Sequence, residues 1–176
     1  MLRGFLKALF HLLFRVQVSG EVSPFSAKRL LIVANHESFL DGLVLGLFLP
    51  VRPTFVVHTG VAQQWFFRLI LSQVDYLAVD PMNPMAMKKV IHLIEAGKPV
   101  MIFPEGRITV TGSLMKVYDG PAFVAAKTGA TIVPVRLDGL ARTYFSRLSG
   151  VHRRVLFPRI RIAIQPPRQI VTVPEG

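Results

Sequence analysis

The sequence contains no cysteine, few acidic residues and no apolar run long enough to cross a membrane. Without cysteine, the chain cannot form disulfides, thiolate metal sites or a cysteine nucleophile. The most apolar long stretch, residues 39–51, is too short for a membrane span and includes Asp41. The five histidines are scattered, so no metal site is expected. Gly-rich phosphate loops and the Gly-x-Ser-x-Gly motif of serine hydrolases are also missing.

Basic residues greatly outnumber acidic ones in this chain. It has 21 Lys and Arg residues against 10 Asp and Glu, a formal net charge of +11 in 176 residues. Such an excess favours an anionic partner, which can be nucleic acid, anionic lipid or an acidic protein. The mean hydropathy of +0.46 is high, so some apolar surface is expected to meet lipid or a partner. We expect no nucleic acid, because the basic and aromatic residues do not combine in a recognisable nucleic-acid-binding motif.

The first 15 residues form a unit of their own. Their basic side chains recur at every fourth position and therefore share one side of a predicted helix: Arg3, Lys7, His11 and Arg15. Apolar residues cover the rest, which suits a helix lying in the plane of a membrane interface with its cations on lipid phosphates. Alternatively, this helix packs on its own domain. We therefore divide the chain into an amphipathic interfacial helix at 1–15 and a single domain at 16–176.

Strand-like and helix-like patterns alternate along the second unit. Strands are predicted at 16–20, 30–35, 54–58, 76–79, 99–103, 131–137 and 159–165, and helices at 38–48, 63–72, 85–96 and 122–128. This alternation predicts one α/β domain with a central, mostly parallel or mixed sheet flanked by helices. Ser38 is the expected N-cap of the helix at 38–48, with Asp41 at its third position. No closing element follows Pro166-Pro167, so we expect a piece of a longer protein.

The predicted strand at 30–35 ends at a pair of residues with complementary chemistry. His36 stands five residues before Asp41. A neutral imidazole can take the proton of a hydroxyl, and a carboxylate at its other nitrogen fixes the tautomer and stabilises the imidazolium. In the alternative interpretation, Asp41 only caps a helix and His36 only satisfies a turn. Because no serine nucleophile motif accompanies the pair, a substrate hydroxyl is expected to attack an activated acyl donor directly.

The predicted strand at 99–103 opens into Glu105-Gly106-Arg107. Arg107 can bind a phosphate through paired N–H donors. Gly106 lets the backbone approach a ligand closely, and its N–H is a candidate oxyanion donor. Glu105 is expected to orient Arg107 or to bind the hydroxyls of an acceptor. A glycine turn with a surface ion pair is the alternative interpretation.

Taken in order, these motifs resemble the glycerolipid acyltransferase family, also called the PlsC-like or lysophosphatidate acyltransferase family. The resemblance rests on Asn-His-x-x-x-x-Asp at 35–41, Phe-Pro-Glu-Gly at 103–106 and Ile-Val-Pro-Val at 132–135. It implies an α/β fold and an enzyme that moves a fatty acyl group to a glycerophospholipid hydroxyl at a membrane surface. The implied donor is acyl carrier protein or coenzyme A carrying the acyl group, with no further cofactor and no metal.

The same resemblance implies a role for each candidate site residue. His36 is the implied general base and Asp41 its partner. Glu105, Gly106 and Arg107 are implied to line the acceptor site. A non-catalytic, basic membrane-binding module remains the alternative to an enzyme.

Over its whole length, the chain is similar to the N-terminal part of bacterial bifunctional enzymes, the 2-acylglycerophosphoethanolamine acyltransferase/acyl-ACP synthetases. Residues 63–65, 103–109 and 112–116 carry this similarity. It implies 2-acyl-glycerophosphoethanolamine as the acceptor, acyl carrier protein as a partner, and a C-terminal acyl-ACP synthetase domain in the full protein. The implied location is the cytoplasmic face of the bacterial inner membrane, with monotopic or peripheral attachment.

Two departures from the general family pattern bear on the acceptor. Arg107 directly follows Gly106, whereas ordinary lysophosphatidate enzymes have Glu-Gly-Thr-Arg. Asp80-Pro81 also stands where those enzymes carry an arginine. The chain thus lacks one arginine of the family pattern and has another at a shifted position. Fewer cations are consistent with a less charged acceptor, a phosphodiester in place of a phosphate monoester. Lysophosphatidate remains the alternative acceptor.

Two further groups of residues leave their partners open. Basic residues gather late in the chain and are expected to meet lipid head groups, the acidic surface of acyl carrier protein, or only solvent: Arg142, Arg147, His152, Arg153, Arg154, Arg159 and Arg161. Trp65-Phe66-Phe67 either anchors the domain at a membrane interface or packs in its core.

Overall fold

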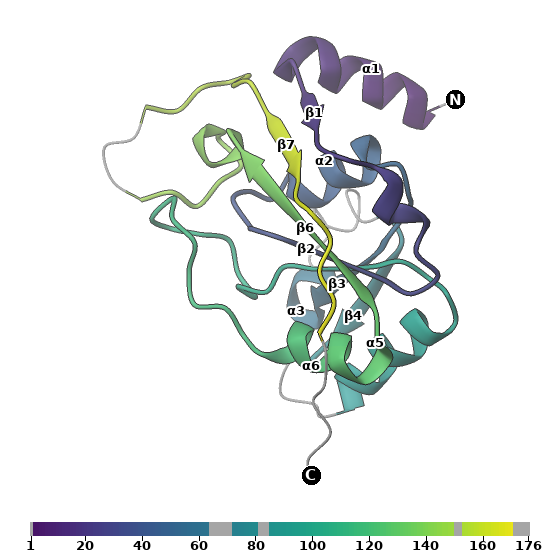
Figure 1. The fold of residues 1–176 in the computed structure, drawn as a ribbon. Coiled ribbons are helices and arrows are strands. Elements are labelled where there is room, and N and C mark those ends of the chain that lie inside the picture. The colour runs from purple at the N-terminus through teal and green to yellow at the C-terminus, as the bar shows by residue number, and fades with distance from the viewer. Residues whose placement is uncertain (1, 64–71, 81–84, 150–152, 171–176) are drawn as a thin grey trace.

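The computed structural model describes residues 2–63, 72–80, 85–149 and 153–170 (Figure 1). Its elements, in chain order, are α1 (Leu2–Phe14), β1 (Gln17–Ser19), the 3₁₀ helix η1 (Ser23–Ser26), β2 (Leu30–Ala34), α2 (Asp41–Phe48), β3 (Thr54–His58), α3 (Thr59–Ala62), β4 (Tyr76–Val79), α5 (Met85–Glu95), β5 (Val100–Ile102), α6 (Gly120–Thr128), β6 (Thr131–Asp138), the 3₁₀ helix η2 (Leu140–Arg142) and β7 (Arg161–Ile164). The predicted strands are therefore present, most of them within two residues of their expected ends.

Seven strands form one mixed sheet in the order β1-β7-β6-β2-β5-β3-β4. β6 and β7 pair antiparallel, and all other neighbouring strands pair parallel. β1 and β7 thus run against the direction of the other five strands. β2 lies between β6 and β5, so three neighbouring strands end at the same edge of the sheet. The predicted α/β domain with a mixed sheet flanked by helices is confirmed.

Helices cover both faces of this sheet because the central strands are apolar on both sides. On β2, Ile32 and Ala34 belong to the cluster that packs under α2, while Leu31 belongs to the cluster under α5 and α6. Such alternation follows from the two-residue period of a strand. A strand buried on both faces reads as a continuous apolar run, which the sequence Leu30–Ala34 shows.

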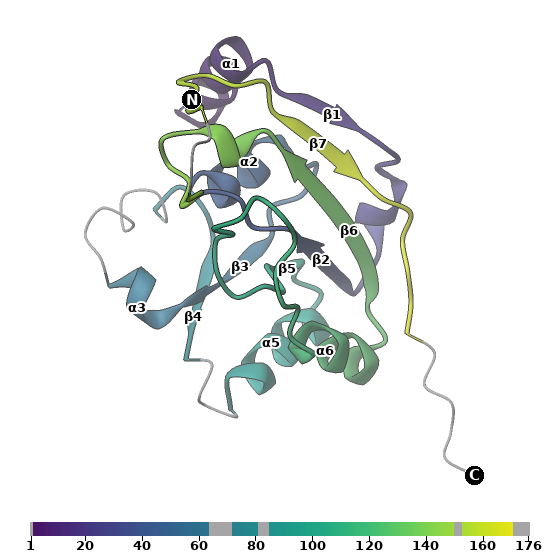
Figure 2. The ribbon, with the colours of Figure 1, turned by 90° about the vertical axis from the view of Figure 1, so that its left-hand side faces the viewer.

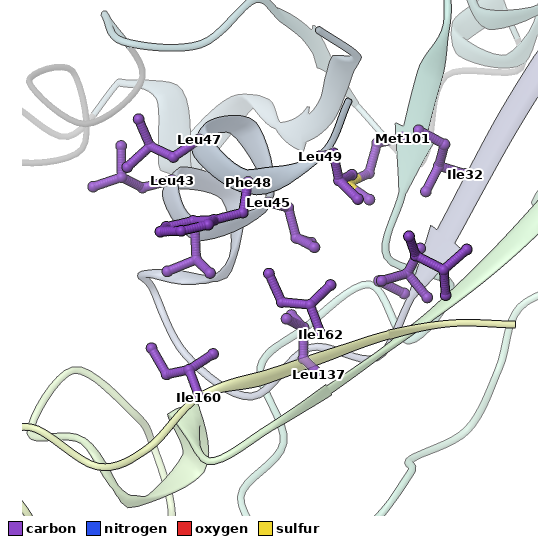
Figure 3. Close-up of a cluster of buried hydrophobic side chains, with 14 of the residues drawn as sticks. Ile32, Leu43, Leu45, Leu47, Phe48, Leu49, Met101, Leu137, Ile160 and Ile162 are labelled. Carbon is purple, nitrogen blue, oxygen red and sulfur yellow. The ribbon is translucent and has the colours of Figure 1, made fainter. Parts of the chain in front are cut away.

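The larger cluster lies between α2 and the sheet. Figure 3 shows side chains of α2 and of Leu49 gathered over Ile32, Met101 and Leu137. On the opposite face, α5 buries Ala86, Val90 and Ile94 at four-residue spacing, as an amphipathic helix does. Figures 1 and 2 place α5 and α6 together, away from α1. The sheet is therefore held between two helical layers.

The N-terminal helix packs on the domain and still exposes apolar side chains. Phe14 is buried, and Leu6, Phe10 and Leu13 pack against the larger cluster, whereas Leu2, Phe5 and Leu12 are exposed. The basic side chains of this helix do not all point away from the domain. Arg3 donates to the Gly46 carbonyl at 2.9 Å, and the Lys7 ammonium lies 5.5 Å from the Phe48 ring centroid. Among the described residues, no helix has both the length and the apolar character needed to cross a bilayer.

One helix prediction differs from the structure, and another lies almost wholly outside the described residues. The helix expected at 38–48 begins at Asp41, and Ser38 is not its N-cap. The reason is that Asp41 accepts the N–H groups of Glu37 and Ser38, which folds residues 37–40 into a turn ahead of the helix. The helix expected at 63–72 falls almost wholly outside the described residues, as do Trp65-Phe66-Phe67, Pro81 and His152. The short α3 just before it was not predicted.

Candidate active site

The candidate site lies at the carboxyl ends of β2, β5 and β6. These strands are parallel neighbours, so the chain segments that follow them meet at one edge of the sheet. The three segments are residues 35–41 after β2, 103–107 after β5, and 139–148 after β6. Open α/β sheets bind ligands at this edge, where loops leave neighbouring strands. The two motifs singled out from the sequence are thus brought together.

His36 and Asp41 form a hydrogen-bonded pair. The distance from His36 Nδ1 to Asp41 Oδ2 is 2.8 Å, and the same oxygen accepts the N–H groups of Glu37 at 2.6 Å and Ser38 at 2.9 Å. Because an ionised carboxylate can only accept, Nδ1 carries the proton and Nε2 presents its lone pair. The His36 side chain is 20% exposed and that of Asp41 is fully buried. The pair therefore offers one imidazole nitrogen to a ligand.

Burial and hydrogen bonding act against each other on Asp41. Burial raises the pKa of its carboxyl above the ordinary value, while the hydrogen bond and the charge interaction with His36 oppose that rise. The two backbone N–H groups of the turn act in the same direction as His36. His36 and the two N–H groups therefore favour the ionised form of Asp41, and this carboxylate holds the imidazole in place.

The backbone and ring of His36 are held from other parts of the chain. Its N–H donates to Glu105 Oε1 at 2.9 Å, and its carbonyl accepts the Thr109 N–H at 2.8 Å. Its ring stacks on Phe103, with 4.1 Å between ring centroids and 13° between the ring planes. The imidazole is therefore positioned by three contacts besides the one from Asp41.

Glu105 and the Gly106 N–H are engaged by the protein's own backbone. Glu105 is 2% exposed, and its second oxygen accepts the Met115 N–H at 2.9 Å, so its carboxylate joins two stretches of backbone and does not reach outward. The Gly106 N–H donates to the Phe103 carbonyl at 3.0 Å, which leaves it no free donor for an oxyanion. Gly106 has φ of +64°, a conformation that favours glycine. Of the three predicted acceptor-site residues, only Arg107 has an exposed side chain.

Two polar residues of the site received no role from the sequence. The Asn35 amide donates to the Leu137 carbonyl at 3.0 Å and accepts the Leu137 N–H at 2.7 Å, which extends the pairing of β2 with β6. Glu37 accepts the Ala141 N–H at 2.9 Å and fixes the segment after β6 against the turn. The sequence did carry a signal for Asn35 and Glu37. Each is a polar residue in a largely buried stretch, and buried polar groups need hydrogen-bond partners.

The carboxyl of Glu37 titrates far from its ordinary range. Burial raises its pKa from 4.5 to about 7, and the carboxylates of Asp41 and Asp138 add to the rise, while the N–H of Ala141 opposes it. Between pH 4.5 and about 7, Glu37 therefore keeps its proton in the folded protein but has released it in the unfolded chain. The protein's free energy of unfolding should fall as the pH rises through this window.

Replacing Glu37 with glutamine is expected to remove that fall. From pH 5 to pH 8 the native chain should lose at most roughly 2–3 kcal/mol more stability than the variant, since one pKa unit corresponds to about 1.4 kcal/mol. Urea unfolding of both proteins at several pH values measures the difference. The same slope of stability against pH in both proteins would show that Glu37 does not titrate in this window.

Within the part of the chain that the structure describes, histidine and carboxylate side chains do not gather in a group of three or more suited to a metal ion.

Comparisons with known proteins were made for sequence and for structure. The model of the family described as Acyltransferase matches residues 15–138. The 1-acyl-sn-glycerol-3-phosphate acyltransferase LPAT1, chloroplastic, of Arabidopsis thaliana is 28% identical over 159 residues, which cover 88% of this chain and 44% of the relative. The corresponding BAT2 protein of Brassica napus is 30% identical over 143 residues, covering 78% and 41%.

The fold is also shared with a solved structure. The crystal structure of the 1-acyl-sn-glycerophosphate acyltransferase PlsC from Thermotoga maritima matches with a TM-score of 0.68 and 18% identity, covering 94% of this chain and 70% of the other. The chain spans less than half the length of the two plant relatives above.

Proposed function

Because the chain belongs to the acyltransferase family, we propose that it transfers a fatty acyl group from a thioester donor to the free hydroxyl of a lysophospholipid. The observation that carries the proposal is the hydrogen bond from His36 Nδ1 to Asp41 at 2.8 Å. It turns the basic Nε2 of a partly exposed imidazole toward a bound substrate. The names of the plant relatives, both 1-acyl-sn-glycerol-3-phosphate acyltransferases, support the reaction class.

The proposed reaction is a direct displacement. The acceptor hydroxyl oxygen attacks the thioester carbonyl carbon while His36 Nε2 takes the hydroxyl proton. The tetrahedral intermediate collapses, the C–S bond breaks, and the leaving thiolate takes the proton from the imidazolium. Asp41 stabilises that imidazolium and keeps its ring oriented, and Glu105 fixes the backbone of His36. Glu105 is thus a positioning residue in this mechanism.

Two acceptors agree with different observations. The direct succession of Gly106 and Arg107, and Asp80 in place of a second arginine, support a phosphodiester such as 2-acyl-glycerophosphoethanolamine. The names of the curated relatives support lysophosphatidate, a phosphate monoester. Our first choice is 2-acyl-glycerophosphoethanolamine, with lysophosphatidate second.

An acceptor and donor panel tests the proposal. The intact chain should acylate a lysophospholipid in detergent or vesicles, and the acceptor with the highest kcat/KM identifies the head group. Parallel assays with acyl-ACP and acyl-CoA identify the donor, for which we propose acyl-ACP. Absence of transfer with every pair, from a folded chain, would refute the proposal for this chain on its own.

Arg107 is proposed to bind the acceptor phosphate. Its side chain is exposed, and no hydrogen bond or ion pair engages its guanidinium within the described residues. Replacing it with glutamine should raise the KM for the acceptor about tenfold or more, because charge-assisted hydrogen bonds contribute about 1.5–3 kcal/mol. Arg168→Gln, at the opposite end of β6, is the matched control and should leave the KM within about twofold. An unchanged KM in the Arg107 variant would remove this residue from the acceptor site.

The setting of the reaction is also a proposal. We place the protein on the cytoplasmic face of a bacterial inner membrane, attached peripherally, with acyl carrier protein as the donor's carrier and an acyl-ACP synthetase domain in the full protein. The net charge of +11 and the exposed apolar residues of α1 support attachment to anionic lipid.

A further inference from the structure

The stretch of chain that follows β6 has an unusual composition. From Leu140 to Ile170 the chain contains seven arginines and no acidic residue. Residues 139–149 and 153–159, between β6 and β7, are called the arginine loop. We ask which of its side chains serve the fold and which are left for a partner.

Three of the seven arginines make side-chain contacts within the protein, namely Arg154, Arg161 and Arg147, which lies over the Phe39 ring. Arg154 donates to the carbonyls of Thr143 at 2.8 Å and Leu148 at 2.6 Å, and to the hydroxyl of Ser146. It therefore holds the loop in one shape and is not offered to a partner. Arg161 lies 3.7 Å from Asp138 in an exposed ion pair. Lipid head groups, acyl carrier protein and solvent were the partners expected for the late basic residues, whereas Arg154 binds the loop itself and Arg161 pairs with Asp138.

Arginine, aromatic and aliphatic side chains are mixed among the exposed residues of the loop. Tyr144 is 65% exposed and Leu156 is 64% exposed. With them, the exposed residues are Arg142, Phe145, Arg147, Arg153, Phe157 and Arg159. Aromatic and aliphatic side chains between arginines are typical of a surface that meets the interface of an anionic membrane. An acidic protein would be matched by the arginines but would leave the apolar side chains unexplained.

The arginine loop is bonded directly to the candidate active site. The Phe145 carbonyl accepts both the Phe39 N–H at 3.1 Å and the Ser38 hydroxyl at 3.2 Å. The guanidinium of Arg147 lies 5.2 Å from the centroid of the Phe39 ring. These contacts fall within the turn that joins His36 to Asp41. A surface that binds the loop therefore lies close to the imidazole.

The loop is also continuous with α1. The Phe157 ring packs edge-on against Phe14 with 5.4 Å between centroids, and Arg15 donates to the Phe157 carbonyl at 2.9 Å. Figures 1 and 2 both place α1 and the described parts of the loop on the same side of the molecule, with α5 and α6 on the other. Both elements carry exposed apolar side chains, Leu12 on α1 and Leu156 on the loop.

We propose that the arginine loop is a second membrane-docking element, which acts with α1 to seat the domain on an anionic bilayer with the turn that carries His36 toward the lipid. This inference rests on the proposed function only in that the acceptor is a membrane lipid. A lysophospholipid would then reach His36 from the bilayer without passing through water.

Vesicle binding tests the inference without any acyl donor. The intact chain and its variants are sedimented with phosphatidylcholine vesicles that contain or lack phosphatidylglycerol. One variant removes apolar contacts (Tyr144→Ser with Phe145→Ser), and the other removes charge (Arg147→Gln with Arg153→Gln). Each should bind the anionic vesicles about tenfold or more weakly than the native chain. The matched controls, Tyr76→Ser at the far sheet edge and Lys88→Gln with Lys89→Gln on α5, should bind within about twofold of it.

Other outcomes overturn the inference. Native-like vesicle binding by both loop variants would show that α1 docks the domain without the loop. A raised KM for acyl-ACP with unchanged vesicle binding would assign the loop to an acidic protein. The single variant Tyr144→Ser, at a side chain that is mostly exposed, covers the case in which a double variant does not fold. Because binding is measured without turnover, a failed acyl-transfer assay leaves this test intact.

Discussion

His36→Ala is expected to lower kcat for acyl transfer about a hundred- to ten-thousandfold, the usual contribution of a general base. The imidazole is held by Asp41 at Nδ1, by Glu105 at its backbone N–H and by the ring of Phe103. Among the described residues, the guanidinium of Arg147 also lies against this turn, over the Phe39 ring, but a guanidinium stays protonated and cannot take a hydroxyl proton. Initial rates with the best donor and acceptor of the panel measure the loss.

Two controls separate catalysis from folding in this experiment. His92→Ala, at an exposed position of α5, should keep kcat within about twofold of the native value. The melting temperature of the His36 variant shows whether loss of the stacking on Phe103 unfolds the domain. A folded His36→Ala protein that turns over at the native rate would exclude the proposed mechanism.

Asp41→Asn is expected to lower kcat by a similar factor, about a hundred- to ten-thousandfold. Its free energy of unfolding should fall only modestly. Asparagine can keep an oxygen where Asp41 Oδ2 accepts three N–H groups, but it carries no charge to stabilise the imidazolium. Its amide nitrogen would occupy the place of Oδ1, which is buried and has no hydrogen-bond partner within the described residues. An unsatisfied buried donor costs about 1–3 kcal/mol, so a modest loss of stability should accompany the large loss of activity.

Asp41→Ala provides the contrast. It removes the acceptor of both backbone N–H groups in the turn as well as the partner of His36, so its free energy of unfolding should fall by more than that of the asparagine variant. Urea unfolding and kcat are measured on both. Should the asparagine variant retain native kcat, the charge of Asp41 is not needed, and the carboxylate only shapes the turn.

The fold and the central pair were predictable because their signals are local. Leu30–Ala34 is an apolar run bounded by polar residues, and such runs indicate a strand buried on both faces. His36 and Asp41 are five residues apart, so the turn that joins them needs little beyond the nearby chain. The order of strands that brings β5 and β6 to either side of β2 was not predicted, since periodicity does not specify which strands become neighbours.

Roles that depend on distant backbone were missed. Glu105 looked like a ligand-binding residue from its neighbours Gly106 and Arg107, yet its oxygens are taken by the N–H groups of His36 and Met115. Arg154 looked like one of several free cations, yet it holds the arginine loop together. In both cases a charged side chain forms hydrogen bonds with main-chain groups. The positions of those groups are set only by the tertiary fold.

The bonds that hold His36 have a consequence for the order of events during synthesis of the chain. His36 bonds Glu105 across 69 positions of sequence, and its neighbours Glu37 and Ser38 bond Ala141 and Phe145 across 104 and 107 positions. Contacts of such long range form late, because closing a large loop costs entropy before the contact repays it. The nascent chain therefore carries the His36 motif early but can assemble the site only after residue 145 has left the ribosome. Until then, the imidazole has its aspartate nearby but not the framework that orients both.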